Sequence, residues 1–316
     1  MKKVLKFLLY VILFILLIGA IGASYIGFSD IPTYPWQITE HLRTIQVPRD
    51  SQQVARGERI ASMLCIKCHS GEGNKLVGKL VADVPKEFGV IHSYNITQDK
   101  EKGIGNWTDG EIIYFLKTGV RKNGTYAPPY MPKFPLMADQ DIQAVVAWLR
   151  SDRPNVQAAT TVQPKNQPNF LVKFLCRVAM KPLPCNEQIA VPDTSNPVVL
   201  GKYLSTALLG CFQCHSESFK TNNEVQPELS KGFFGGGNPL LDMEGNTVVS
   251  KNITPDPSGI GKMTEAQFVT LLKTGQRPDG SMIHYPMEPY PLLSDTEVKA
   301  IYAYLKTVPP LATKSK

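Results

Sequence analysis

The sequence predicts a mainly α-helical protein, with two similar globular units behind a helix that spans a membrane. Three observations support this fold class. Residues 4–28 form a long apolar run with Lys6 as its single charge. The stretch C-x-x-C-H occurs at residues 65–69 and again at residues 211–215, each time after a segment with helical spacing of apolar residues. The 24 Gly and 25 Pro residues indicate long, turn-rich loops rather than sheets.

The apolar run is long enough to cross a bilayer as a helix, which takes about 20 apolar residues. Lys2, Lys3 and Lys6 precede or open the run, and such a positive flank stays in the cytoplasm while the rest is exported. The alternative is a cleaved signal peptide, but its apolar region is typically about 7–15 residues long. We therefore expect residues 1–28 to form an uncleaved, single-pass anchor in the inner membrane, with the globular part in the periplasm.

The repeated C-x-x-C-H stretch is the attachment motif of c-type haem. The two cysteines form thioethers with the haem vinyl groups and the adjacent histidine reaches the iron, so one turn of backbone must hold all three groups. Two copies in similar surroundings argue against a chance match. We expect two covalently bound haem c groups, attached through Cys65, Cys68 and His69 in the first copy and through Cys211, Cys214 and His215 in the second.

The two copies share more than this motif. N-I-T occurs at Asn95 and at Asn252, and each is followed by a helical pattern that ends in L-K-T-G. The spacing of Thr108 and Glu111 predicts a capping box at the first such helix, and a second capping box opens the last helix of the chain at Ser294. These landmarks place a tether at 29–50, the first unit at 51–153, a linker at 154–190 and the second unit at 191–316.

The repeat also selects candidates for the sixth ligand of each iron. Met131 and Met287 each lie eight residues before the aspartate that opens the closing helix, in a proline-rich loop. A thioether ligand favours Fe(II) and raises the potential relative to bis-histidine ligation. His284 is the runner-up because it lies three residues from Met287. His92 has no counterpart in the second copy and is interpreted as a surface or pocket histidine.

Several residues keep two interpretations. Asn95 and Asn252 recur at one place in the repeat, which favours a cofactor-binding role over glycosylation, and their amides can bind either backbone or a haem propionate. Cys176 and Cys185 in the linker either form a disulfide or remain two free cysteines. The linker segment around Cys176 is apolar but too short to span a membrane, and we expect it to pack between the two units. Trp36 in the tether sits either at the membrane interface or against the body.

From residue 51 onward the chain resembles the membrane-bound multihaem cytochrome c subunits of bacterial alcohol, gluconate and related sugar dehydrogenases. The resemblance rests on N-I-T-P-D-P-S-G-I-G with the following T-E-A-Q-F, and on P-M-E-P-Y-P-L-L-S-D-T-E-V-K-A-I-Y-A-Y-L. It implies two tandem class I cytochrome c domains with His/Met iron. By position, Gly57 should meet Trp148, and Gly201 should meet Tyr304, where the terminal helices cross. The chain departs from this family in having two haem motifs rather than three.

The sequence therefore predicts a membrane-anchored dihaem electron carrier and not an enzyme, because two six-coordinate irons leave no position for a substrate. The expected redox partners are a dehydrogenase or quinol-oxidising complex on one side and a terminal oxidase or soluble cytochrome on the other. The alternative is a dihaem redox enzyme of the peroxidase or thiosulfate-oxidising type, against which the twin methionines argue. The formal net charge is +7. The basic residues are not clustered with aromatic residues, so we expect no nucleic-acid binding.

Overall fold

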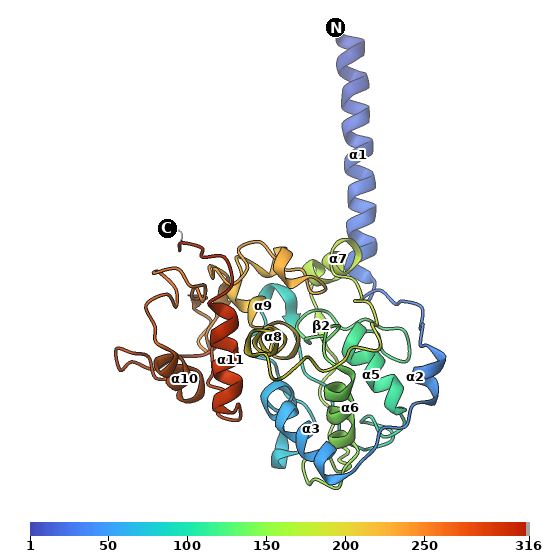
Figure 1. Cartoon of the computed structure of the whole chain (residues 1–316). Helices are drawn as coiled ribbons and strands as arrows, with labels where there is room; N and C mark the ends of the chain where they lie inside the picture. The colour runs from blue at the N-terminus through green and yellow to red at the C-terminus, as the bar shows by residue number, and fades with distance from the viewer. Residues whose placement is uncertain (314–316) are drawn as a thin grey trace.

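The structure is a computed structural model of the whole chain, and it is described here for residues 1–313. One long helix, α1 (Lys2–Phe28), projects from a mainly helical body (Figure 1). None of α1 is buried against the body, and its length and composition suit a membrane span, although a signal sequence passes the same test. The long, exposed α1 agrees with the apolar helix that the sequence predicts, while its retention as an anchor stays a prediction.

The first unit is built around the first C-x-x-C-H motif. Its helices are α2 (Glu40–Thr44), α3 (Ser51–Leu64), α4 (Ile66–His69), α5 (Asp109–Thr118) and α6 (Asp139–Leu149), with the short turns η1 (Glu72–Asn74) and η2 (Lys86–Phe88). Thr108 and Glu111 form the predicted capping box of α5, which ends at Gly119 in the left-handed conformation. The core of this unit lies mainly between α3, α5 and α6.

The second unit repeats this order. Its elements are α8 (Pro197–Lys202), the π-helical η3 (Tyr203–Leu208), α9 (Cys211–His215), η4 (Phe219–Thr221), η5 (Pro227–Leu229), α10 (Glu265–Thr274) and α11 (Asp295–Leu305). Ser294 and Glu297 form the predicted capping box of α11. The helix before the second motif differs from its counterpart α3, because α8 continues into the wider π-helical turns of η3. One hydrophobic cluster extends through both units.

The crossing of the terminal helices is the same in the two units. A Cβ on Gly57 would lie 1.8 Å from the Ala144 carbonyl oxygen and 3.0 Å from Trp148 Cβ. A Cβ on Gly201 would lie 1.9 Å from the Ala300 carbonyl oxygen and 2.8 Å from the Cβ of Tyr304. No side chain fits at such distances, so glycine lets α3 meet α6, and lets α8 meet α11, backbone against backbone. The two predicted helix contacts are confirmed.

Sheets are minor in this fold. Strand β1 (Gly89–Val90) pairs antiparallel with β2 (Gln167–Pro168), and β3 (Pro239–Leu241) pairs antiparallel with β4 (Thr247–Val249). The first pair joins the first unit to residues of the linker. The second pair forms a hairpin in the longer loop that precedes the second N-I-T segment.

Residues 29–50, the predicted tether, pack on the first unit. Leu42 of α2 is buried, and its backbone lies so close to α5 that only glycine fits at position 110. Trp36 packs edge-on against Tyr114, with ring centroids 4.6 Å apart. Of the two interpretations of Trp36, the structure therefore shows packing on the body.

The linker also wraps the first unit. Its helix α7 (Phe170–Val178) does not lie between the two units, as the sequence suggested, but at the base of α1 (Figure 1). Only Val172 and Cys176 of α7 are buried, so the helix has one narrow inward side and packs against a single unit. Cys176 and Cys185 are both free cysteines in the structure.

Candidate functional site

Each C-x-x-C-H motif forms one turn of helix. In the first motif, the backbone N–H groups of Cys68 and His69 donate to the Cys65 carbonyl at 3.2 and 3.0 Å. In the second motif, the five residues from Cys211 to His215 are α9 itself. One turn therefore carries both thiols and the imidazole in each unit, which is the arrangement that haem attachment requires.

The two motif histidines are oriented in the same way. Nδ1 of His69 lies 2.8 Å from the Tyr94 carbonyl oxygen, and Nδ1 of His215 lies 2.7 Å from the Lys251 carbonyl oxygen. A carbonyl partner requires the proton on Nδ1, so Nε2 carries the lone pair that binds a metal. Burial lowers the pKa of both imidazoles, which favours the neutral, ligating form.

The four motif cysteines are free thiols in the structure. Burial raises the pKa of Cys65 and Cys211 to about 12 each, and it also raises the pKa of Cys68 and Cys214. All four side chains are therefore protonated at neutral pH. A thiol is the group that adds across a haem vinyl to give a thioether, so the chemistry of the donor set fits haem c.

The predicted methionine ligands occupy similar loops. Met131 and Met287 are both half-buried beside the core. The Met131 N–H donates to the Pro128 carbonyl at 3.0 Å, and the Met287 N–H donates to the His284 carbonyl at 3.1 Å, so each residue closes a tight turn. The runner-up, His284, is exposed. The pairing of His69 with Met131 and of His215 with Met287 stays a prediction.

Asn95 and Asn252 have a clear structural role. Nδ2 of Asn95 donates to the Ala159 carbonyl at 2.7 Å, and its Oδ1 accepts from the N–H of Thr97 at 2.8 Å. Nδ2 of Asn252 donates to the Leu311 carbonyl at 2.6 Å, and Thr254 donates to its Oδ1 in the same way. Each asparagine thus fastens the chain that follows a closing helix. Of the two expected partners the structure shows the backbone, and a cofactor-binding role for either residue stays a prediction.

The first unit has a buried lysine, Lys133, in the loop of Met131, whereas the equivalent position in the second unit is a proline. Lys133 is two residues from Met131, and its ammonium is buried without a hydrogen-bond partner among the described residues. Burial lowers its pKa to about 7. Buried polar groups normally have a partner, so an anionic group such as a haem propionate fits this position. Sequence reasoning missed Lys133, although a lysine inside the apolar stretch M-P-K-F-P was a usable signal.

The two motifs are linked by a cluster of charged and aromatic side chains. Lys67, between the cysteines of the first motif, places Nζ 3.2 Å from Glu288 Oε1 and 4.4 Å from the centroid of the Tyr285 ring. The Tyr285 hydroxyl donates in turn to the Asp83 carboxylate. Lys67 and Asp83 also influence the pKa of both Cys68 and Cys214. The first motif therefore contacts the loop of Met287, a contact across more than 200 residues that no local pattern predicts.

A second contact between the units lies away from the motifs. Arg59 of α3 forms two hydrogen bonds to the Glu297 carboxylate of α11, at 2.8 and 2.9 Å. Tyr203 donates to Asp141 Oδ2 at 2.5 Å. A cavity of about 480 Å³ lies beside these groups, between α3, α8 and α11. The lining residues come from both units, so the cavity is part of the interface between them.

Comparison with known proteins places these observations in a family. Residues 54–152 match the family described as cytochrome c. The alcohol dehydrogenase (quinone) cytochrome c subunit of Gluconacetobacter polyoxogenes is 29% identical over 281 residues, which cover 83% of this chain and 57% of the relative. The fructose dehydrogenase cytochrome subunit of Gluconobacter japonicus is 28% identical over 88% of this chain and 55% of its own length. The chain thus spans little more than half the length of these relatives.

A relative nearer in length is the diheme cytochrome c-type protein of Cereibacter sphaeroides, which is 28% identical over 81% of this chain and 86% of its own length. Among solved structures, the Kuenenia stuttgartiensis reducing HAO-like protein complex covers 83% of this chain at 16% identity, but the TM-score of 0.25 is too low to support a shared fold. Together, the motif geometry and the family match show that residues 54–152 are a cytochrome c domain, in a chain whose relatives include the cytochrome c subunits of alcohol, fructose and gluconate dehydrogenases.

Proposed function

We propose that the chain is a dihaem cytochrome c that carries electrons at the outer face of the inner membrane and is not itself an enzyme. The observation that carries this proposal is the repeated geometry of the motifs: each unit has one C-x-x-C-H turn whose histidine is held by a backbone carbonyl. This repeat supports reading residues 51–153 and 191–316 as two tandem cytochrome c domains, each with one covalently bound haem c.

In this proposal, each side chain has a defined task. Nε2 of His69 and of His215 would bind the two irons, and Met131 and Met287 would each supply a soft thioether as a further ligand. The four motif cysteines would bind the haem covalently. When bound, each haem supplies a one-electron Fe(III)/Fe(II) couple. If His69 and Met131 hold one iron, and His215 and Met287 hold the other, neither iron would have a position left for a substrate.

The contact between the motifs supports a relay rather than two independent carriers. Nζ of Lys67, in the first motif, lies 3.2 Å from Glu288 Oε1, and Glu288 follows Met287, the proposed methionine ligand of the second unit. The two proposed attachment sites therefore share neighbouring side chains, which supports an arrangement in which both haems belong to one electron-transfer unit. We propose that electrons pass between the two sites inside the chain.

The redox partners follow from the relatives. Those relatives are named as subunits of alcohol, fructose and gluconate dehydrogenases, which supports a dehydrogenase as the electron donor. A quinol-oxidising complex is the other donor that we propose, and the acceptor would be a terminal oxidase or a soluble cytochrome. The lysines that open α1 support a cytoplasmic amino terminus, with the body held in the periplasm by an uncleaved anchor.

The haem ligation is tested by visible spectroscopy of the full chain, purified from membranes. Haem determination should give two haems per chain. The oxidised protein should show methionine-to-iron charge-transfer absorption. Met131→Ala and Met287→Ala should each remove the part of this absorption that comes from one haem. Met137→Leu is the matched control, because Met137 is a buried core residue without a proposed ligand role.

Two outcomes would contradict this assignment. Full charge-transfer absorption in either alanine variant would exclude that methionine as a ligand. High-spin iron in the wild-type protein would indicate an open coordination position and would favour the alternative function, a dihaem redox enzyme of the peroxidase or thiosulfate-oxidising type.

A further inference from the structure

Helix α7 has an apolar face that is exposed on the surface of the protein. This face, which we call the apolar face of α7, consists of Phe170, Leu171, Phe174 and Val178. Each of these side chains is 39–58% exposed, and the rings of Phe170 and Phe174 stack on each other with centroids 6.2 Å apart. Scattered exposed apolar residues are ordinary on a protein surface, but a contiguous group on one short helix indicates a binding surface.

The face is a product of helical geometry. At about 100° per residue, the four exposed side chains fall within an arc of roughly 100°, and Val172 and Cys176 lie on the opposite side. Those two residues are buried against the first unit, together with Tyr126. The helix is therefore amphipathic in an unusual sense, because its strongly apolar side points away from the protein that it packs on.

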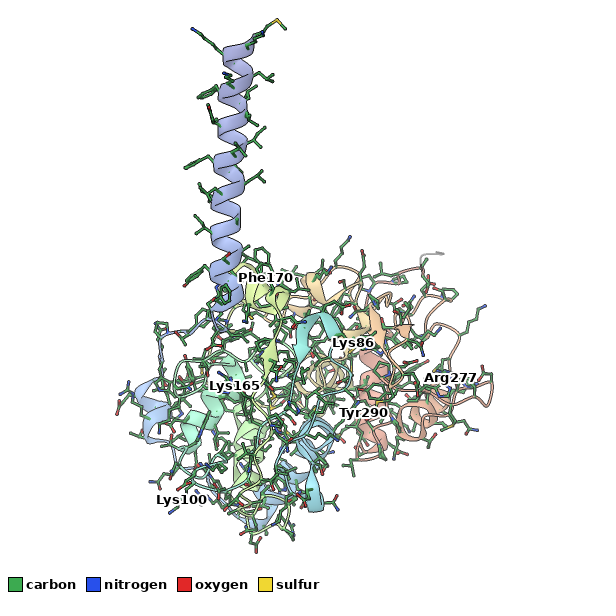
Figure 2. The ribbon with its side chains drawn as sticks, turned by 180° about the vertical axis from the view of Figure 1, so that it is seen from behind. Lys86, Lys100, Lys165, Phe170, Arg277 and Tyr290 are labelled. Atoms are coloured by element: carbon green, nitrogen blue, oxygen red, sulfur yellow. The ribbon has the colours of Figure 1, made fainter. Side chains whose placement is uncertain are left out.

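The position of α7 identifies what covers this face. Lys173 Nζ donates to the Gly27 carbonyl at 2.8 Å, and Arg177 donates to the Ser29 hydroxyl at 2.6 Å. Two basic side chains thus bind the carboxyl end of α1, where free carbonyls and the helix dipole favour positive charge. Figure 2 shows Phe170 where α1 enters the body. Phe28, in the last turn of α1, is 95% exposed, so the apolar surface of α1 continues onto α7.

The charges beside the apolar face fit a membrane surface. Lys173 and Arg177 flank it along the helix, and Lys181 follows one turn after its end. Exposed Lys86 lies near the start of α7, since its carbonyl accepts from the Asn169 amide at 3.2 Å. A helix with an apolar face and basic flanks partitions into the interface of a bilayer, where basic groups meet anionic lipid headgroups.

We propose that α7 lies in the membrane interface beside α1, with its apolar face among the lipids. This inference rests on the proposed role of α1 as an anchor. It adds a second, non-spanning contact that α1 alone does not provide. A single helix followed by a flexible tether lets a domain rotate freely, whereas α1 and α7, joined through Lys173 and Arg177, fix the orientation of the first unit on the membrane. The haem sites then face partner complexes in one orientation.

The test uses the full chain with its haems, reconstituted into nanodiscs that contain anionic phospholipid and a diazirine-bearing phospholipid. After irradiation, peptide mass spectrometry locates the lipid adducts. We expect adducts on α1 and on residues 170–178. The segment of Met282 is the control, because Met282 is exposed to a similar extent, at 47%, and Arg277, which binds its carbonyl, lies far from α1 (Figure 2). We expect no adducts there.

The double substitution Phe170→Ser and Phe174→Ser should lower the labelling of residues 170–178 severalfold, without changing the labelling of α1. Both side chains are exposed, so the haem absorption spectrum should stay as in the wild type. Met282→Ser, the matched control, should leave all labelling unchanged.

Three results would overturn the proposal. The first is labelling of α1 without labelling of α7 above the Met282 segment. The second is unchanged labelling of α7 in the double variant. The third is absence of label from α1 as well, which would overturn the proposed anchor itself and is recognised by the failure of the chain to enter the nanodiscs.

Discussion

Helices α5 and α10 occupy the same place in the two units, yet they lie in different surroundings. Both have ten residues, a capping box at the start and a left-handed glycine at the end. Eight residues of α5 are buried, whereas two residues of α10 are. The difference comes from α2 and the linker, which cover α5. The repeated sequence thus encodes a common scaffold. The segments that are not repeated determine how deeply the side chains of each unit are buried and which charged groups lie near them.

The largest expected effect of this difference concerns a lysine that occurs at the same position in both units. Lys117 and its equivalent Lys273 both bind the first aspartate of the closing helix, Asp139 at 2.7 Å and Asp295 at 2.5 Å. Lys117 is 1% exposed and also donates to the Asn186 carbonyl of the linker, whereas Lys273 is 30% exposed. Lys117→Met should lower the free energy of unfolding by about 1–3 kcal/mol, because it removes two hydrogen bonds from a buried ammonium to the half-buried Asp139 carboxylate and Asn186 carbonyl.

The matched variant is Lys273→Met, which should leave the urea midpoint unchanged, since exposed ion pairs contribute little. Urea unfolding followed by haem absorption and by circular dichroism measures both. Equal losses of stability in the two variants would contradict the view that the linker cover distinguishes the units.

The second expected effect concerns potential. Lys133 is a buried cation in the loop of Met131, and the equivalent position in the loop of Met287 is Pro289. At pH values below the Lys133 pKa of about 7, the side chain carries a positive charge. This charge favours the reduced haem, which carries one positive charge less than the oxidised form. Lys133→Gln should lower the potential of one haem by roughly 40–80 mV, which corresponds to about 1–2 kcal/mol for one electron.

Spectroelectrochemical titration of the full chain resolves the two haems. Lys100→Gln is the control, because Lys100 lies at the end of the body opposite α1 (Figure 2) and should change neither potential. A shift of both haems in the Lys133 variant, or of neither, would show that this charge does not distinguish the two sites.

Local patterns predicted the scaffold well. The capping pair Thr108 and Glu111 and the spacing of the C-x-x-C-H turns depend on residues within a few positions of each other, and the structure has them as expected. Gly57 and Gly201 were placed through the family resemblance, since composition alone does not show which backbone a glycine approaches. These features recur in both units because each is a property of a short segment.

The surroundings of the sites were much harder to predict. The pairing of Lys117 with Asn186, and the position of α7 under α1, depend on where a proline-spaced linker runs in space. Such a path is set by weak contacts distributed over many residues, and it leaves no periodic signal. The buried Lys133 was missed for a related reason: an isolated lysine is normally a surface residue, and only its three-dimensional neighbours show otherwise.

The smallest expected effect on stability belongs to the contact where the two units meet beside their motifs. Lys67 and Glu288 are 38% and 50% exposed, so Lys67→Met should cost at most about 0.5 kcal/mol of stability. Its effect on electron transfer should be larger than its effect on stability, because Lys67 also covers the ring of Tyr285 and holds the loop of Met287 against the first motif. Transfer between the haems should slow severalfold. It is measured by flash reduction of the fully oxidised protein, after which the electron passes from the haem of lower potential to the haem of higher potential.

A matched variant separates this role from a general effect of charge. Lys79→Met removes an exposed lysine of the first unit that also influences the pKa of Cys68. Within residues 1–313, the Lys79 side chain forms no ion pair with the loop of Met287. If both variants slow the transfer equally, the cause is the electrostatic field at Cys68. If only Lys67→Met slows it, the contact between the units positions the second site. The two units would then differ in their surroundings and still act as one relay, because a side chain from inside one haem motif sets the geometry of the other.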